Sequence, residues 1–334
     1  AGLNPNFVIY DDGEQLTAVK QALRDLKLDE KLYKPEAMRS AISKAKNELI
    51  RPQQFEATTY WAEIARRVYA RYEEILTANG GLDFDDLLCR VAWLFREQPE
   101  VLKRYQDRYE YLLVDEFQDT NTAQYEMVYR LASASRNVFC VGDEDQSIFM
   151  FRGADYRNVM RFREDFPEAK VVLLEQNYRS TQTILDVANA VIARNQHRTP
   201  KKLRTDRGQG LEIISHEAYD EADEAAFVVS TIQRLVRGHQ ATLGDCAVMY
   251  RTNAQSRSLE DAFIARGIPY RLVGGVRFYQ RREIKDALAY LRLVHNPADN
   301  ISLGRIINVP PRSIGDKTVS NLAAWSAELG VSMV

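Results

Sequence analysis

Short apolar runs alternate with helix-length stretches along most of the chain, and this alternation most limits the fold that it can adopt. Residues 111–114, 137–141 and 171–174 are mainly apolar. A strand without polar alternation is buried on both faces, and helices between such strands connect them into a parallel sheet. We therefore expect an α/β fold in which parallel sheets carry helices on both faces.

The same reasoning predicts the remaining elements. Further strands are expected at 211–215, 246–250 and 270–273, and helices at 84–95, 123–132, 183–192, 222–236 and 258–265. The first 81 residues differ, because they are charged and helical in pattern: Trp61, Ile64, Val68 and Tyr72 recur at three- and four-residue steps and form one apolar stripe. Such a block indicates an inserted or appended helical subdomain, and the tail from Pro297 is also expected to be mostly helical.

Composition excludes several classes of protein. Apolar residues are 45% and charged residues 28% of the 334, which excludes wholesale disorder. No run reaches the ~18 apolar residues of a membrane span, and no secretory signal is visible at the start. The three cysteines lie far apart, so neither a zinc site nor a disulfide framework is expected. Cys140 and Cys246 stand in apolar runs and are expected to be buried thiols, in keeping with a cytoplasmic location.

The balance of charge is nearly even. With 45 Lys and Arg against 47 Asp and Glu, the formal net charge is −2. That value neither supports nor excludes a nucleic-acid partner, because binding needs a local basic surface rather than a basic total.

Acidic residues follow the first of these strands directly. Asp115 and Glu116 come after the apolar run 111–114. Ligands of open α/β sheets bind at the carboxyl ends of the strands. An Asp there can hold Mg²⁺ on a nucleotide, and the neighbouring Glu can orient or deprotonate an attacking water. Taken alone, such a pair is more often a solvated acidic turn after a strand.

Polar segments also follow the next two strands. Residues 142–147 read Gly-Asp-Glu-Asp-Gln-Ser, and residues 175–180 read Glu-Gln-Asn-Tyr-Arg-Ser. Three successive strands that each end in acidic, amide or arginine side chains are poorly explained by surface solvation. The pattern therefore favours one functional site at this edge of the sheet.

These segments carry a resemblance to a known family. Residues 115–121 (DEFQDTN), 141–148 (VGDEDQSI) with 151–155 (FRGAD), and 174–181 (LEQNYRST) resemble the second, third and fourth motifs of the UvrD/Rep/PcrA group of superfamily 1 DNA helicases. The match continues, in family order, through 82–88, 250–257 and 274–279. It therefore covers nearly the whole chain.

The resemblance implies a fold and an activity. The fold would be two RecA-like P-loop NTPase motor lobes with helical insertions, divided into four parts: 1–81 (insertion of the first lobe), 82–175 (remainder of the first lobe), 176–292 (first part of the second lobe) and 293–334 (start of its insertion). The activity would be ATP- and Mg²⁺-dependent 3′–5′ movement on single-stranded DNA that unwinds duplexes in repair or replication. Implied partners are single-stranded DNA, duplex/single-strand junctions and repair or replication proteins, without a membrane, in a cytoplasmic, nucleoid-associated protein.

The resemblance also implies roles for individual residues in nucleotide chemistry. Asp115 would hold Mg²⁺ and Glu116 would be the catalytic base. Gln146 would sense the γ-phosphate and pass that signal to the DNA site. Tyr178 would stack on the adenine, and Arg179 would reach the γ-phosphate as an arginine finger. Charge spreads over the oxygens of a transferring phosphoryl group, so a guanidinium there lowers the barrier.

A first set of residues is expected to contact DNA after the third motif. Phe149 and Phe151 occupy positions where the family has aromatic residues that stack on bases, and Arg152 is adjacent. Stacking suits movement over any sequence, because every base has a π-face. Phe151 stands where Trp is usual, and its smaller ring should stack more weakly on a base. Met150 stands where a basic residue is common, and it offers no contact to a phosphate. Core packing of the two phenylalanines is the alternative.

A second set lies farther along the chain. Arg251, within the matched segment 250–257, is implied to contact DNA. Arg277 and Phe278 are better supported by the sequence itself, since aromatic and basic residues interleave there. Two other basic stretches, at 157–163 and 194–207, are as well explained by a solvated face as by a DNA backbone.

One motif of such a motor is missing. The loop G-x-x-x-x-G-K-[ST] cradles the phosphates, yet none of the 16 glycines is followed by Lys. We expect this loop to precede Ala1 and the last two family motifs to follow Val334. The chain would then be an internal piece of a helicase and inactive by itself. The helicase part of a RecB/AddA-type helicase–nuclease and a non-catalytic DNA-binding module of the same fold remain alternatives.

Overall fold

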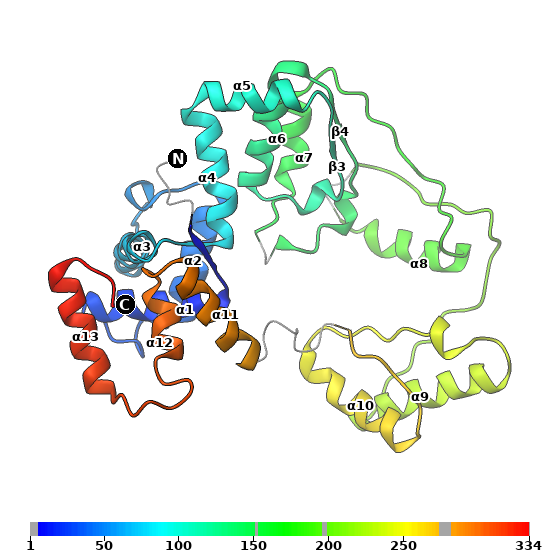
Figure 1. Cartoon of the computed structure of the whole chain (residues 1–334). Helices are drawn as coiled ribbons and strands as arrows, with labels where there is room; N and C mark the ends of the chain where they lie inside the picture. Colours follow the sequence, from blue (N-terminus) through cyan, green and yellow to red (C-terminus); the bar gives the residue numbers. More distant parts are fainter. Residues whose placement is uncertain (1–5, 151–152, 196–198, 274–281, 334) are drawn as a thin grey trace. The chain divides into compact units, whose positions relative to one another are not determined.

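The computed structural model describes residues 6–150, 153–195, 199–273 and 282–333. The chain divides into two compact units (Figure 1). The first comprises Ala1–Leu173, Asn195–Pro200 and Tyr279–Val334, and the second comprises Leu174–Arg194 and Lys201–Phe278. The division into four parts that the family resemblance implies stays a prediction.

Most of the described elements belong to the first unit. In chain order they are β1 (Val8–Tyr10), α1 (Asp12–Asp25), α2 (Pro35–Asn47), α3 (Tyr60–Ala78), β2 (Gly81–Asp83), α4 (Phe84–Glu97), α5 (Pro99–Arg108), β3 (Leu112–Val114), the 3-10 turn η2 (Phe117–Asp119), α6 (Thr122–Ser135), β4 (Val138–Cys140), the 3-10 turn η3 (Glu144–Gln146), α7 (Arg157–Asp165), α11 (Arg282–His295), α12 (Asn300–Ile306) and α13 (Asp316–Leu329). The second unit contains α8 (Gln182–Ile192), α9 (Glu221–Arg237), the 3-10 turn η6 (Asn253–Gln255) and α10 (Ser256–Ala265).

Helices α1, α2 and α3 form the largest core of the first unit. The apolar stripe expected on α3 is buried, and Ile64, Val68 and Tyr72 are almost inaccessible to solvent. They pack with residues of α1 and α2 such as Leu23 and Met38. The helical block expected over the first 81 residues is therefore confirmed, with the addition of two short strands that its pattern did not predict.

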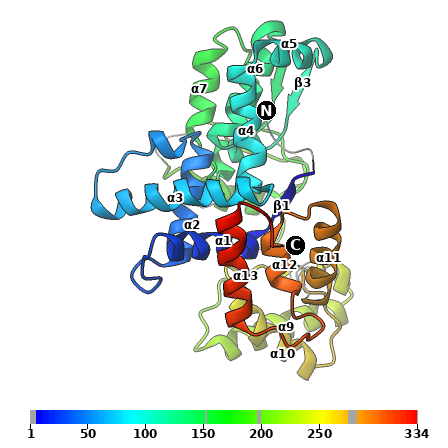
Figure 2. The ribbon, with the colours of Figure 1, turned by 60° about the vertical axis from the view of Figure 1, so that its left-hand side comes forward.

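Those two strands, β1 and β2, pair in parallel and join the block to the end of the chain. Tyr10 of β1 donates a hydrogen bond from its hydroxyl to Asp299 Oδ1, at 2.7 Å, at the start of α12. Lys285 Nζ of α11 lies 2.6 Å from Asp11 Oδ2, and Arg292 of the same helix pairs with Glu14 of α1. Both views show α12 beside α1 (Figure 2).

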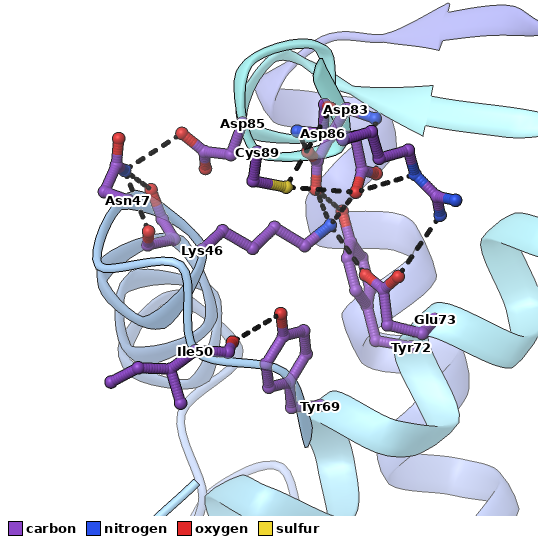
Figure 3. A network of polar contacts seen from close by, with 12 residues as sticks. Lys46, Asn47, Ile50, Tyr69, Tyr72, Glu73, Asp83, Asp85, Asp86 and Cys89 are labelled. Atoms are coloured by element: carbon purple, nitrogen blue, oxygen red, sulfur yellow. Dashed lines mark hydrogen bonds and ion pairs between the residues drawn. The ribbon is translucent and has the colours of Figure 1, made fainter. Parts of the chain in front are cut away.

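A buried charge cluster joins α2, α3 and α4 (Figure 3). Lys46 is fully buried, and its ammonium reaches three carboxylates: Glu73 Oε1 at 2.6 Å, Asp83 Oδ2 at 2.8 Å and Asp86 Oδ1 at 2.9 Å. The Tyr72 hydroxyl also donates to Asp83 Oδ2, at 2.8 Å. Burial alone would lower the pKa of Lys46, but the surrounding carboxylates raise it well above its usual range. The lysine therefore stays charged and ties the three helices together.

Strands β3 and β4 pair in parallel, as predicted from the apolar runs 111–114 and 137–141. Leu112 pairs with Val138, and Val114 with Cys140. The neighbouring helix α6 packs against β3 and α7. The opposite side of this two-stranded sheet carries exposed side chains, since Leu113 is 79% and Phe139 62% accessible. Parallel pairing is thus confirmed, whereas cover by helices on both faces is not seen in the described part.

The expectation of four further strands is wrong for this structure. No strand forms at 171–174, 211–215, 246–250 or 270–273; near the first two of these, a single parallel bridge joins Gln176 to Arg204. An apolar run becomes a strand only when a partner satisfies its backbone N–H and C=O groups. Leu174 is 76% and Leu211 85% accessible, so neither run has a covered face that would favour pairing. Apolar character predicted buried strands, but the runs at 171–174 and 211–215 are exposed, and a strand also needs a pairing partner that the run itself does not specify.

The helices of the second unit do agree with expectation. The three helices α8, α9 and α10 coincide with the predicted ranges to within two residues. Val229 and Ile232 of α9 pack with Phe263 of α10 to form its core.

The cysteines differ from expectation. Cys89 is the fully buried one, whereas Cys140 and Cys246 are only partly buried. Burial nevertheless raises the pKa of Cys140 to about 11. Among the described helices, none combines the length and the apolar character that crossing a bilayer requires.

Candidate active site

The turn after β3 presents two carboxylates. Asp115 and Glu116 are both exposed there, and the Glu116 amide donates to Asp115 Oδ1 at 2.9 Å. Glu116 has φ 49° and ψ 41°, in the left-handed region that side-chain-bearing residues rarely adopt. The Phe117 amide holds the turn by donating to Val141 O, at 2.9 Å, beyond the end of β4. Strained residues of this kind concentrate at functional sites and cost about 1–3 kcal/mol each.

Gln118 connects this turn to the one that follows β4. Its Nε2 donates to Glu116 Oε2 at 2.7 Å, and its Oε1 accepts from the Asp143 amide at 2.9 Å. Asp143 Oδ2 in turn accepts from Gln146 Nε2, at 2.8 Å. The ends of two neighbouring parallel strands are therefore linked by one chain of hydrogen bonds from Glu116 to Gln146.

The turn after β3 is suited to a divalent cation. Asp119 Oδ1 is buried, and no donor among the described residues reaches it. Burial and the charge of Glu116 raise the pKa of Asp119 above its ordinary value. Asp115 adds a third carboxylate to the turn. No group of three His, Cys, Asp or Glu among the described residues is arranged to hold a metal alone. Mg²⁺ held with nucleotide phosphates needs only one or two carboxylates, and this turn fits that requirement.

Buried amides fasten the same loops to the helical core. Asn121 caps α6 by accepting from the Gln124 amide, at 2.8 Å, and its Nδ2 donates to Asn47 Oδ1 of α2. Asn158 of α7 is fully buried and donates to Thr120 O at 2.9 Å. The turn that bears Glu116 is therefore held between α2, α6 and α7 rather than lying free on the surface.

The segment after Gln146 borders a cavity. Phe149 is half-buried there, and Met150 is exposed. The cavity has a volume of about 860 Å³ and belongs to the first unit. Its lining combines apolar and charged side chains: Glu144, Ser147, Met150, Ala154, Tyr156, Arg157, Val159, Met160, Arg163, Asn195, Thr199 and Pro200.

The second unit presents Tyr178 and Arg179 on one turn. Both side chains are exposed, and Tyr178 is 80% accessible. Asn177 Oδ1 holds the turn by accepting from the amides of Arg179, at 2.9 Å, and Ser180, at 2.8 Å. At Gly210, with φ +80°, a Cβ atom would lie 2.2 Å from the Thr181 hydroxyl oxygen, so the neighbouring loop approaches this turn as closely as a glycine allows.

The remaining expected site residues divide into two groups. Arg251 is exposed, and its amide donates to Gln255 Oε1 at 3.0 Å, next to η6. Phe151, Arg152, Arg277 and Phe278 lie outside the described residues.

The structure thus brings together part of the expected site. Asp115, Glu116 and Gln146 share one region of the first unit, whereas Tyr178, Arg179 and Arg251 belong to the second. The convergence of Glu116, Gln146 and Arg179 on one ligand stays a prediction. Sequence reasoning missed Gln118, because its burial beside the Glu116 carboxylate follows from contacts between segments that the local sequence does not show.

Comparison with known families identifies both halves of the chain. Residues 1–167 match the model of the UvrD/REP helicase N-terminal domain, and residues 172–334 match that of the UvrD-like helicase C-terminal domain. The two matches meet near the boundary between the first and second compact units.

Curated relatives cover the chain almost completely. Proteins named ATP-dependent DNA helicase PcrA are 46% identical over 333 residues in Bacillus subtilis (strain 168) and 45% identical over 333 residues in Leuconostoc citreum. The same name belongs to a relative in Staphylococcus aureus (strain Mu50 / ATCC 700699) that is 46% identical over 334 residues. Each alignment covers 99% of this chain and 44–46% of the relative, so the chain spans about half the length of the curated relatives it matches. With the turns after β3 and β4 carrying the motif residues, and both halves matched in order, the chain belongs to the UvrD/REP helicase family.

Proposed function

We propose that this chain forms part of an ATP-dependent DNA helicase that moves 3′ to 5′ on single-stranded DNA and unwinds duplexes in repair or replication. The observation that carries the proposal is the hydrogen-bonded path from Glu116 to Gln146 across the ends of β3 and β4. A path of this kind suits a motor, because the carboxylate that acts on water is then coupled to an amide that can respond to a phosphate. The names of the relatives agree with this activity.

The chemistry at the first unit would be phosphoryl transfer to water. Asp115 and its neighbours would hold Mg²⁺, which when bound neutralises charge on the phosphates. Glu116 would accept a proton from the attacking water, and its exposure leaves room for that water. Gln146, held by Asp143, would donate a hydrogen bond toward the γ-phosphate.

Two residues of the second unit would also act on the nucleotide. Tyr178 would stack on the adenine with its exposed ring. Arg179 would bring its guanidinium to the γ-phosphate and stabilise charge that develops during transfer. The fixed backbone of this turn supports both roles, since the Asn177 carboxamide orders it before any ligand arrives. We propose RecA-like motor lobes as the fold that carries these residues.

DNA would be bound by aromatic and basic side chains. Phe149 would stack on a base beside the 860 Å³ cavity, whose apolar wall of Met150 and Met160 suits a nucleobase. Arg251 of the second unit would contact the phosphate backbone. Phe151, Arg152, Arg277 and Phe278, which lie outside the described residues, are also proposed to contact DNA.

Two alternatives are less well supported. A helicase–nuclease would share the same motifs, but the relatives from B. subtilis, L. citreum and S. aureus carry the helicase name alone. A non-catalytic DNA-binding module would not need a hydrogen-bonded carboxylate and amide at neighbouring strand ends. We further propose that the chain alone does not hydrolyse ATP, because no glycine precedes a lysine as a phosphate-binding loop requires.

The decisive experiment measures ATP turnover and the unwinding of 3′-tailed duplexes by the full-length protein. We expect both activities, with ATP turnover stimulated by single-stranded DNA. Glu116→Gln should lower kcat by about 10²–10⁴-fold, the usual contribution of a general base. Glu110→Gln, at the other end of β3, is the matched control and should retain activity. Wild-type protein that binds DNA without hydrolysing ATP would favour the non-catalytic alternative.

A further inference from the structure

The carboxamide of Gln118 is buried but serves an exposed neighbour. Gln118 is only 1% accessible, whereas Glu116 is exposed. Within the described part of the chain, Gln118 is the one side chain that hydrogen-bonds to the Glu116 carboxylate. A flexible glutamate on the surface samples several rotamers, so a fixed donor at 2.7 Å restricts it to one of them.

The two ends of the carboxamide cannot be exchanged. Its NH₂ group faces a carboxylate that only accepts, and its oxygen faces the Asp143 N–H, which only donates. Rotating the amide by 180° would place an oxygen against the Glu116 carboxylate and two donors against each other. The Asp143 N–H therefore fixes the direction in which Gln118 presents its donor to Glu116.

Gly142 leaves the space in which this carboxamide lies. A Cβ atom added at Gly142 would lie 2.8 Å from Gln118 Oε1 and 3.3 Å from the Gln118 amide nitrogen. Oxygen and carbon do not approach to 2.8 Å without displacement, so a larger residue here would push the carboxamide away. The glycine after β4 and the glutamine after β3 are therefore matched to each other.

Asp143 carries the connection onward. Its carboxylate accepts from Gln146 Nε2 at 2.8 Å and from the Asp145 amide at 3.0 Å, while its own amide donates to Gln118. A displacement of Gln118 would thus reach both the Glu116 carboxylate and the backbone that orients Gln146.

We propose that Gln118 is a positioning residue for ATP hydrolysis, which sets the orientation of the Glu116 carboxylate and couples it through Asp143 to Gln146. This inference rests on the proposed function, since it assigns Gln118 a role in the same reaction. Gln118 itself touches neither water nor phosphate in this role. Its removal should therefore lower kcat while the KM for ATP changes little.

The test compares three variants of the full-length protein with wild type. Gln118→Met keeps the volume and loses both hydrogen bonds. Gln118→Glu keeps the acceptor for Asp143 but turns a second carboxylate toward Glu116. Gly142→Ala displaces the carboxamide without altering it. We expect each to lower DNA-stimulated kcat by about 10- to 100-fold, the scale for a misplaced reacting group. The KM for ATP should stay within about threefold, and Gln118→Glu should be the least active because like charges repel.

The control is Gln106→Ala, which removes an amide that donates to Arg130 O at 2.7 Å between α5 and α6, and it should retain wild-type kcat. A purely structural role for Gln118 would lower the melting temperature and reduce all activities in proportion, and that result would overturn the proposal. A wild-type kcat in both Gln118→Glu and Gly142→Ala would also overturn the proposal. These two variants decide the test if Gln118→Met does not fold. Wild-type protein without ATP turnover would instead refute the proposed function.

Discussion

Lys46 illustrates how one buried charge can hold several helices. Its ammonium is fully buried and contacts three carboxylates, so the loss of the lysine leaves a buried negative cluster. We expect Lys46→Met to lower the free energy of unfolding by about 3–5 kcal/mol, the usual cost of breaking a buried ion pair. Urea denaturation measures this change in the free energy of unfolding. Lys103→Met, which removes an exposed pair with Asp107, should cost less than about 1 kcal/mol. Equal effects of the two substitutions would show that the cluster is not needed for stability.

Asp86, in the same cluster, makes stability depend on pH. Burial raises its pKa to about 6, with Lys46 opposing and Asp83 adding to the rise. The folded state therefore binds this proton more tightly than the unfolded state. Its contribution to stability is complete below about pH 4 and is lost as the pH rises through about 6. Asp86→Asn should remove that loss, so the difference in unfolding free energy between wild type and variant should change between pH 4 and 6 and stay constant above pH 7. A constant difference across the whole range would contradict the assignment.

At the scale of elements, Asn121 combines two tasks at the start of α6. It caps the helix and also donates to Asn47 on α2. Asn121→Ala should cost about 2–4 kcal/mol, since it removes the cap and leaves a buried acceptor without its donor. Asn121→Ser should restore the cap alone and recover about half of that loss. Thr59→Ala, which removes only the cap of α3, should cost about 1 kcal/mol in the same thermal unfolding assay. If Asn121→Ala costs no more than Thr59→Ala, the link to α2 adds nothing.

The elements also show how far sequence alone could reach. The ranges of α6 and α9 followed from helix-length patterns, and the strands β3 and β4 followed from short apolar runs without polar alternation. The polar turns after β3 and β4 followed from the rule that parallel strands end at one edge. The absent strand at 211–215 could not be foreseen, because pairing depends on a second segment that apolar character does not specify.

The buried polar residues were harder to predict. Lys46 reads as a solvated lysine on a helix, although Ile42, four residues before it on the same face of α2, is buried. This apolar neighbour was the available signal. Gln118 gave no such signal, since its burial depends on Gly142, which is distant in the sequence. Contacts between segments, rather than local pattern, fix both positions.

At the scale of the whole molecule, the two compact units should unfold separately, as multidomain chains commonly do. All three tryptophans lie in the first unit, so their fluorescence reports that unit, while circular dichroism reports both. Asp299 caps α12 and accepts from Tyr10, so Asp299→Ala should cost the first unit about 2–4 kcal/mol and shift the fluorescence transition. Val229→Ala should destabilise the core of the second unit by about 2 kcal/mol. It should shift the unfolding transition of the second unit, which circular dichroism detects, and leave the fluorescence transition unchanged. If either substitution shifts both signals equally, the units unfold as one body.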